Sequence, residues 1–151
     1  MRKTYLRPLI FAASLIIVFI VAGCTKLCNS GYEGSRCNQL TTTKFIARWN
    51  AVDTPGNLTY TDTINQGPEI NDITLSTSFA GHHFSHIINA SVANNVITIP
   101  YQQPDSGGNF VKGTGTISDN QDSILFAYQI ISGVDSPQLV TNYAGTWLRA
   151  N

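Results

Sequence analysis

From residue 44 onward, apolar and polar residues alternate with a period of two, and this alternation restricts the folds open to the chain. Between Ile73 and Phe79, for example, Ile, Leu, Thr and Phe occupy the odd positions, and Thr and Ser occupy the even ones. A period of two puts every second side chain on the same face of a strand. Threonine and β-branched residues also favour strands. No amphipathic helical stripe follows Tyr60, so the pattern predicts an all-β domain.

One predicted hairpin turns at Asn94-Asn95, because asparagine tolerates the positive φ of a two-residue turn. This register makes one face of the hairpin wholly apolar and the other mostly polar, which a shift by one residue would scramble. The predicted pairs are Ala90–Ile99, Val92–Ile97 and Ile88–Tyr101 on one face and Ser91–Thr98 on the other.

A second predicted hairpin has Asp119 to Asp122 as its loop. It places two glycines opposite aromatic residues, so that the rings can fold across the neighbouring strand of a curved sheet. The predicted pairs are Ile117–Ile124, Gly115–Phe126, Gly113–Tyr128 and Val111–Ile130.

The alternation and the turn residues together predict seven or eight strands, at about 44–52, 58–65, 70–79, 84–93, 96–103, 110–118, 123–132 and 141–149. Short sequential strands favour an antiparallel meander that is closed or nearly closed to remove its edges. With the ending Gly145-Thr146-Trp147-Leu148, this order resembles the lipocalin-like β-barrels that follow EGF-type fragments in small bacterial lipoproteins. A β-sandwich is the alternative.

The first 23 residues have the composition of a signal peptide. Arg2, Lys3 and Arg7 precede an apolar run from Leu9 to Val21, interrupted only by Ser14. This run suits an apolar signal core of roughly 7–15 residues, and it is short for a spanning helix, which needs about 20. We therefore expect a helical signal segment over 1–23, a stalk over 24–40 and a β domain over 41–151.

The segment Val21-Ala22-Gly23-Cys24 resembles the lipobox of bacterial lipoproteins. That resemblance implies cleavage between Gly23 and Cys24 and acylation of Cys24 by chains such as palmitate. Two or three acyl chains anchor a protein stably where one does not. The expected location is the cell envelope, lipid-anchored, at the outer membrane. An uncleaved N-terminal anchor is the alternative.

Cys28 and Cys37 remain after lipidation of Cys24, and in an exported chain such a pair predicts a disulfide. A ring of this size stabilises the fold by about 2.5–3 kcal/mol through loop closure. The spacing C-x2-G-Y-x-G-x2-C, with Gly31, Tyr32 and Gly34, resembles the last loop of an EGF-like domain. The other four EGF cysteines and the calcium-binding acidic residues are missing, so no calcium site is expected.

Composition and motifs exclude several functions. Three of the nine basic residues and none of the nine acidic residues precede Cys24, so the mature chain has a net charge of about −3 and no basic cluster for nucleic acid. No catalytic motif or cofactor-binding loop occurs. His82 and His86 would lie about 13 Å apart on a strand, too far for one zinc ion. We therefore expect no catalytic residue, cofactor or metal.

The sequence therefore predicts a non-catalytic envelope lipoprotein whose barrel binds a small apolar ligand or a protein partner. Trp49, Phe126, Tyr128 and Trp147 are the candidate ligand-lining residues, because aromatic side chains on inward faces can line a cavity. A densely packed interior would argue against this site. The alternatives are a structural or adhesive surface module with the EGF-like loop as spacer and, more remotely, a hydrolase.

Overall fold

A computed structural model describes residues 27–133 and 138–150 of the chain. Most strands continue the alternation of the sequence, with buried side chains on one face and exposed side chains on the other. The elements in chain order are β1 (Tyr32–Glu33), β2 (Gln39–Leu40), the 3-10 helix η1 (Thr41–Lys44), β3 (Ala47–Thr54), β4 (Leu58–Gln66), β5 (Asp72–Leu75), β6 (Ser78–Phe79), β7 (His82–His83), β8 (Ile88–Ala93), β9 (Val96–Gln102), β10 (Asn109–Ile117), β11 (Ser123–Ser132) and β12 (Leu139–Arg149).

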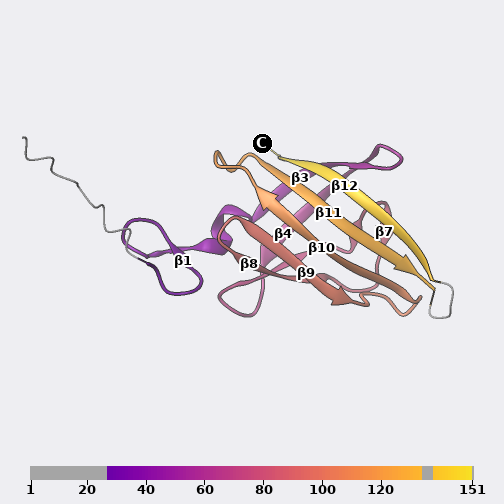
Figure 1. Cartoon of the computed structure of the whole chain (residues 1–151), viewed down its shortest axis with the longest axis horizontal. Coiled ribbons are helices and arrows are strands. Elements are labelled where there is room, and N and C mark those ends of the chain that lie inside the picture. Colours follow the sequence, from indigo (N-terminus) through magenta and orange to yellow (C-terminus); the bar gives the residue numbers. More distant parts are fainter. Residues whose placement is uncertain (1–26, 134–137, 151) are drawn as a thin grey trace, which may run out of the picture.

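Eight strands form a closed antiparallel barrel in the cyclic order β3-β4-β5-β8-β9-β10-β11-β12 (Figure 1). Each strand pairs with its neighbour in this meander, and β12 closes the barrel by pairing with β3, from Ala144–Thr54 to Arg149–Trp49. The predicted all-β meander is thus confirmed with eight strands, and the sandwich alternative is wrong. In the described part of the chain, no helix has the length and apolar content needed to span a membrane.

The hairpin of β10 and β11 has the predicted register, from Asn109–Ser132 to Ile117–Ile124. Gly115 lies opposite Phe126, and a Cβ atom built on Gly115 would lie 2.6 Å from Cε1 of that ring. The aromatic ring therefore occupies the space over the glycine, as the sequence predicts, and only a residue without a side chain fits there.

The hairpin of β8 and β9 has the predicted register only near its turn. Ser91–Thr98 and Val92–Ile97 pair as expected, but the described ladder does not include Ala90–Ile99 or Ile88–Tyr101. Pro100 has no backbone N–H to donate, and the side chain of Gln102 instead bonds the backbone N–H and carbonyl of Asn89, at 3.0 and 2.6 Å.

Residues 76–87 leave the barrel wall, so the predicted strands 70–79 and 84–93 are wrong in this segment. The first strand ends at Leu75 and the second begins at Ile88, and between them β6 and β7 form a separate two-stranded hairpin. Alternation alone could not show this departure, because Phe79 is fully buried here as it would be in a wall strand. The predicted strand 44–52 also begins later, at Ala47, because η1 occupies residues 41–44.

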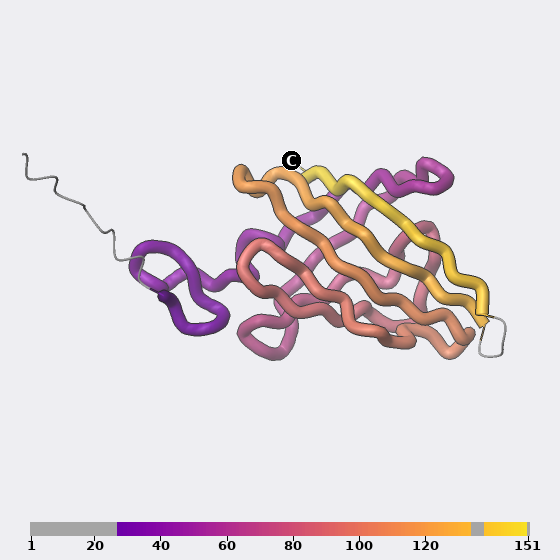
Figure 2. The backbone as a smooth tube through the Cα atoms, in the orientation of Figure 1, coloured from indigo at the N-terminus to yellow at the C-terminus, as the bar shows by residue number. Residues whose placement is uncertain are grey.

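The predicted disulfide joins Cys28 and Cys37, with Cα atoms 5.2 Å apart. Gly31 and Gly34 have φ of 87° and 84°, the left-handed conformations expected of glycines in this loop. The loop lies at one end of the barrel, and the tube in Figure 2 shows it as a distinct lobe. The expected signal helix, the cleavage site at Gly23 and the lipidation site at Cys24 lie outside the described residues.

Candidate functional site

The four predicted ligand-lining residues all point into the barrel, where at most 3% of each is exposed. The rings of Phe126 and Trp147 lie 4.4 Å apart between centroids. Tyr128 instead packs against Phe79, at 4.5 Å. Trp49 lies nearer the end of the barrel that holds the disulfide loop. Its Nε1 donates to the carbonyl of Phe45, and the Arg149 guanidinium lies 4.6 Å from its ring centroid. The fold thus brings three of the four residues together.

Phe79, on β6, fills the space among these aromatic rings. Its ring centroid lies 5.6 Å from that of Trp147 and 6.3 Å from that of Phe126. The same hairpin is followed by Phe84, which is 1% exposed. The chain's own side chains therefore occupy the interior around Phe126, Tyr128 and Trp147.

Asp53 forms a buried polar centre within this packing. Its Oδ2 accepts hydrogen bonds from the hydroxyl groups of Tyr60, at 2.5 Å, and Tyr128. Its Oδ1 accepts from Nε1 of Trp147 at 3.2 Å. Burial, together with the bond to Asp53, raises the pKa of both tyrosine hydroxyls far above their ordinary range. Both tyrosines therefore remain protonated donors, and the centre stabilises the packing of four strands, β3, β4, β11 and β12.

The close approach of Asp53 also depends on Gly145, its partner on β12. A Cβ atom on Gly145 would lie 1.8 Å from Oδ1 of Asp53, so any larger residue would displace the carboxylate. In the ending Gly145-Thr146-Trp147-Leu148, Gly145 therefore makes room for the buried carboxylate of Asp53, and Trp147 donates a hydrogen bond to that carboxylate.

Asp62 is a second fully buried carboxylate, and it is only half satisfied. Its Oδ1 accepts the backbone N–H of Ser76 at 2.9 Å, where the chain leaves the barrel wall. Its Oδ2 is buried and has no partner among the described residues. Burial raises the pKa of Asp62 to about 6, against the opposing effect of the Ser76 hydrogen bonds. Asp62 therefore ties the β6–β7 segment to β4.

The histidines lie around this segment and do not converge. Nδ1 of His83 lies 3.1 Å from the hydroxyl of Ser78, and Nδ1 of His86 lies 3.3 Å from the carbonyl of Pro104. Within residues 27–133 and 138–150, no group of three or more His, Cys, Asp or Glu side chains has an arrangement that could hold a metal ion.

A groove of about 530 Å³ lies over strands β9 to β12, and sequence reasoning missed it. Six of its lining residues, Tyr101 among them, are on outward-facing positions of their strands, and the other four are their neighbours in the same wall. The lining consists of Ile99, Tyr101, Lys112, Gly113, Thr114, Ala127, Tyr128, Gln129, Asn142 and Tyr143. Tyr128 is the one predicted ligand-lining residue that contributes to it.

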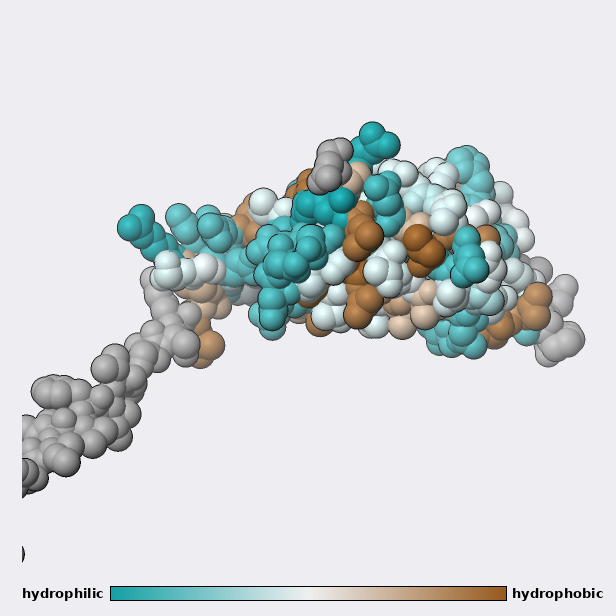
Figure 3. All heavy atoms as spheres, turned by 90° about the horizontal axis from the view of Figure 1, so that it is seen from above, coloured by the Kyte–Doolittle hydropathy of each residue, from teal (hydrophilic) through white to brown (hydrophobic). Residues whose placement is uncertain are grey.

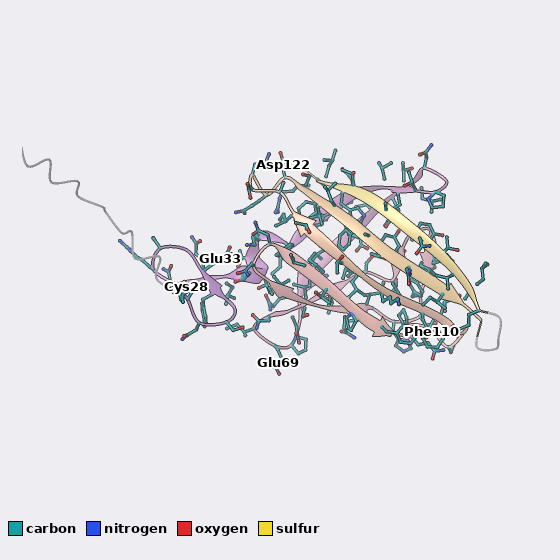
Figure 4. All side chains as sticks on the ribbon, viewed as in Figure 1. Cys28, Glu33, Glu69, Phe110 and Asp122 are labelled. Carbon is teal, nitrogen blue, oxygen red and sulfur yellow. A yellow bond between two sulfur atoms is a disulfide. The ribbon has the colours of Figure 1, made fainter. Side chains whose placement is uncertain are left out.

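A β-bulge turns Tyr101 toward this groove. Ile99 pairs with Gly113 and Gln102 pairs with Val111, so Pro100 and Tyr101 together lie opposite one residue of β10. The extra residue moves Tyr101 from the inward to the outward face, where 54% of it is exposed. Its ring stacks on Phe110 at 4.9 Å with an interplanar angle of 8°. Phe110 lies at the barrel end remote from Cys28 (Figure 4). Pro100 within an apparent strand was the sequence signal for this irregularity.

A row of polar side chains crosses three strands beside Tyr101. Lys112 pairs with Gln129, and Gln129 pairs with Asn142. Nε2 of Gln129 donates to Oδ1 of Asn142 at 2.7 Å. Among the described residues, this bond leaves the Asn142 amide nitrogen, the Gln129 amide oxygen and the Lys112 ammonium without a protein partner. The row therefore offers both donors and acceptors to a bound molecule.

Another part of the outer wall has exposed apolar residues that lie among polar ones on the neighbouring strands. Val52, Leu125 and Leu148 are each about half exposed, on β3, β11 and β12. In Figure 3, apolar spheres lie between polar ones across the middle of the barrel. None of these three residues lines the groove at Tyr101, which combines apolar and polar groups and is therefore the better candidate site.

The opposite end of the barrel holds the disulfide loop in place. The backbone N–H of Thr41 donates to the carbonyl of Gly31 at 2.9 Å. The side-chain amide of Asn71 donates to the hydroxyl of Ser30, also at 2.9 Å. Lys44 donates to Glu33 at 2.5 Å and to Asn95 at 2.8 Å. The loop is therefore bonded to the barrel at several points, and Figure 4 shows Glu33 between the loop and the barrel.

No protein-family model, curated protein or solved structure matches the chain.

Proposed function

We propose that the protein is a non-catalytic envelope lipoprotein, anchored at the outer membrane through lipid on Cys24, whose barrel binds a small molecule with an apolar face. The anchor is supported by the basic residues, the apolar run and the segment ending in Cys24. The disulfide suits an oxidising compartment outside the cytoplasm. The bonds between its loop and the barrel fix the position of the loop relative to the barrel.

The groove at Tyr101 carries the binding part of this proposal. Ligand sites commonly enclose about 300–1,000 Å³ and combine apolar surface with a few polar groups. The groove has a volume of about 530 Å³, the exposed aromatic ring of Tyr101 and, among the described residues, amide groups without protein partners. The interior is a poorer candidate in this conformation, because Phe79 already fills the space among Phe126, Tyr128 and Trp147.

Native mass spectrometry of the lipoprotein, purified from its own membranes, tests the binding function. We expect a co-purifying small molecule that is lost in Tyr101→Ala and retained in Tyr32→Ala, a matched change at a partly exposed tyrosine of the disulfide loop. A ligand retained in both variants would place binding elsewhere. The absence of any bound molecule across purification conditions would argue against a ligand carrier.

Fractionation tests the anchor separately. Cys24→Ala should leave the protein without lipid, uncut by the lipoprotein signal peptidase, and should change its fractionation. Unchanged processing and fractionation would refute the lipid assignment.

A structural or adhesive module is the second candidate function, and the fixed disulfide loop favours it. A loop bonded to the barrel through Gly31, Ser30 and Glu33 presents the far end of the domain in one orientation. If the domain captures a defined envelope protein while its own groove is empty, this function is supported over ligand binding.

A further inference from the structure

The ring of Tyr101 is an exposed aromatic platform that is already held in place. Its stacking on Phe110, at 4.9 Å and 8°, restricts the ring before any ligand arrives. A restricted side chain loses little conformational entropy on binding. The outer face of a planar stack can accept a flat apolar surface.

The row beside this platform favours a partner that carries hydroxyl groups. An acyl chain over Lys112, Gln129 and Asn142 would bury their polar groups without hydrogen bonds, which costs free energy at each one. A nucleic acid needs clustered cations, and Lys112 is the one basic residue among those that line the groove. A peptide strand cannot add to the wall by strand pairing, because the barrel is closed and has no free edge there.

A pyranose sugar meets both requirements. The C–H groups on one face of the ring form an apolar surface, and the hydroxyl groups at its edge donate and accept hydrogen bonds. The amide nitrogen of Asn142 can donate to such a hydroxyl, and the amide oxygen of Gln129 can accept from one. Thr114 adds a hydroxyl group on the same outward face. Its cross-strand partner Ala127 has a small side chain, which leaves room for a sugar ring beside the polar row.

The length of the row suits more than one sugar ring. Tyr101, Lys112, Gln129 and Asn142 lie on four successive strands. Neighbouring strands are about 4.8 Å apart, so the row extends roughly 14 Å, the length of about three linked pyranose rings. An open groove across a barrel wall can accept an internal segment of a long chain.

We infer that this groove binds a glycan strand, with Tyr101 stacked on one sugar ring and Gln129, Asn142 and Lys112 bonded to hydroxyl or N-acetyl oxygen groups of the next rings. This inference rests on the proposed binding function and specifies the class of ligand. It assigns the groove to binding an oligosaccharide or a short segment of a longer glycan.

Calorimetric titration of the full-length mature lipoprotein tests the inference, in a detergent without a sugar head group so that the detergent does not compete. The probes are N-acetylchitotetraose, cellotetraose and, as an apolar comparison, laurate. We expect at least one tetrasaccharide to bind. Tyr101→Ala should weaken this binding about 10-fold or more, and Asn142→Ala about 5-fold, as losses of a stacking contact and of a hydrogen bond predict. Tyr32→Ala should change it less than about 2-fold.

Tyr101→Phe keeps the ring and should retain affinity within about 2-fold, which separates loss of stacking from loss of folding. Laurate binding that Tyr101→Ala abolishes, without binding of either tetrasaccharide, would overturn the glycan assignment and leave the proposed binding function standing. Binding of no probe would count against both. Tetrasaccharide binding that is unchanged in Tyr101→Ala and Asn142→Ala would overturn the placement in this groove.

Discussion

Asp62 should make the protein less stable as pH rises from 4 to 7. Its pKa is about 6 in the folded protein, against an ordinary value of 3.8, because burial disfavours the charged form. Between these two values the folded state holds a proton that the unfolded state has released. Raising the pH therefore favours unfolding, and the stabilisation present below pH 3.8 is lost as pH passes through 6.

The size of this effect follows from the difference between the two pKa values. Of the roughly 3 kcal/mol that this difference represents, about 2.5 kcal/mol of unfolding free energy is lost between pH 4 and pH 7. Nearby Asp53 also raises the pKa of Asp62, whereas the N–H of Ser76 lowers it. Asp62→Asn removes the titrating group and keeps an oxygen that can accept the Ser76 N–H.

Urea denaturation at fixed ionic strength, followed by tryptophan fluorescence, measures this effect, because Trp49 and Trp147 are both buried. The unfolding free energy of the wild type should fall by about 2.5 kcal/mol relative to Asp62→Asn between pH 4 and pH 7. Asp119→Asn, at an exposed turn position, is the matched control. Two parallel curves for the wild type and Asp62→Asn would refute the assignment of Asp62 as a buried group that charges at a cost.

Two further changes test packing within the fold. Gly115→Ala should lower the unfolding free energy by about 1–3 kcal/mol, because the new Cβ atom would lie 2.6 Å from the Phe126 ring. Gly107→Ala is the control and should have little effect in the same urea titration, because its new Cβ atom would lie 3.4 Å from the nearest atom. Equal stability of the two variants would contradict the close glycine–ring packing. Glu33→Gln leaves the Lys44 side chain, which is only 7% exposed, without its anionic partner. This change should destabilise the protein by about 1–2 kcal/mol and speed amide exchange in the disulfide loop. Unchanged loop exchange by mass spectrometry would show that this ion pair does not fix the loop.

The strand pairings that sequence reasoning obtained are those set by local chemistry. The β10–β11 hairpin follows from alternation and from glycines opposite aromatic residues, and its whole register is as predicted. The β8–β9 hairpin departs where Pro100 interrupts the ladder. Pro100 was visible in the sequence, but the direction in which Tyr101 would turn depended on its pairing with β10.

The candidate site could not be read from the sequence, because its residues come together only through the barrel. Nothing in the chain links Tyr101 with Asn142 until β9, β10, β11 and β12 lie side by side. The inward-facing aromatic residues could be predicted from the alternation, but their packing against Phe79 could not. Phe79 would be buried on a strand of the barrel wall as it is on the inserted hairpin, so its burial does not distinguish the two.

The sequence alone determined the all-β class, the disulfide and most of the strands, because alternation, turn residues and cysteine spacing act over a few neighbouring residues. Tertiary structure alone decided that the barrel closes, that Phe79 fills its interior and that Tyr101 faces outward beside a polar row. These outcomes depend on contacts between distant segments, whose free energies arise only when the strands meet. Alternation fixes which side chains share a face, and the closed barrel decides what lies against each face.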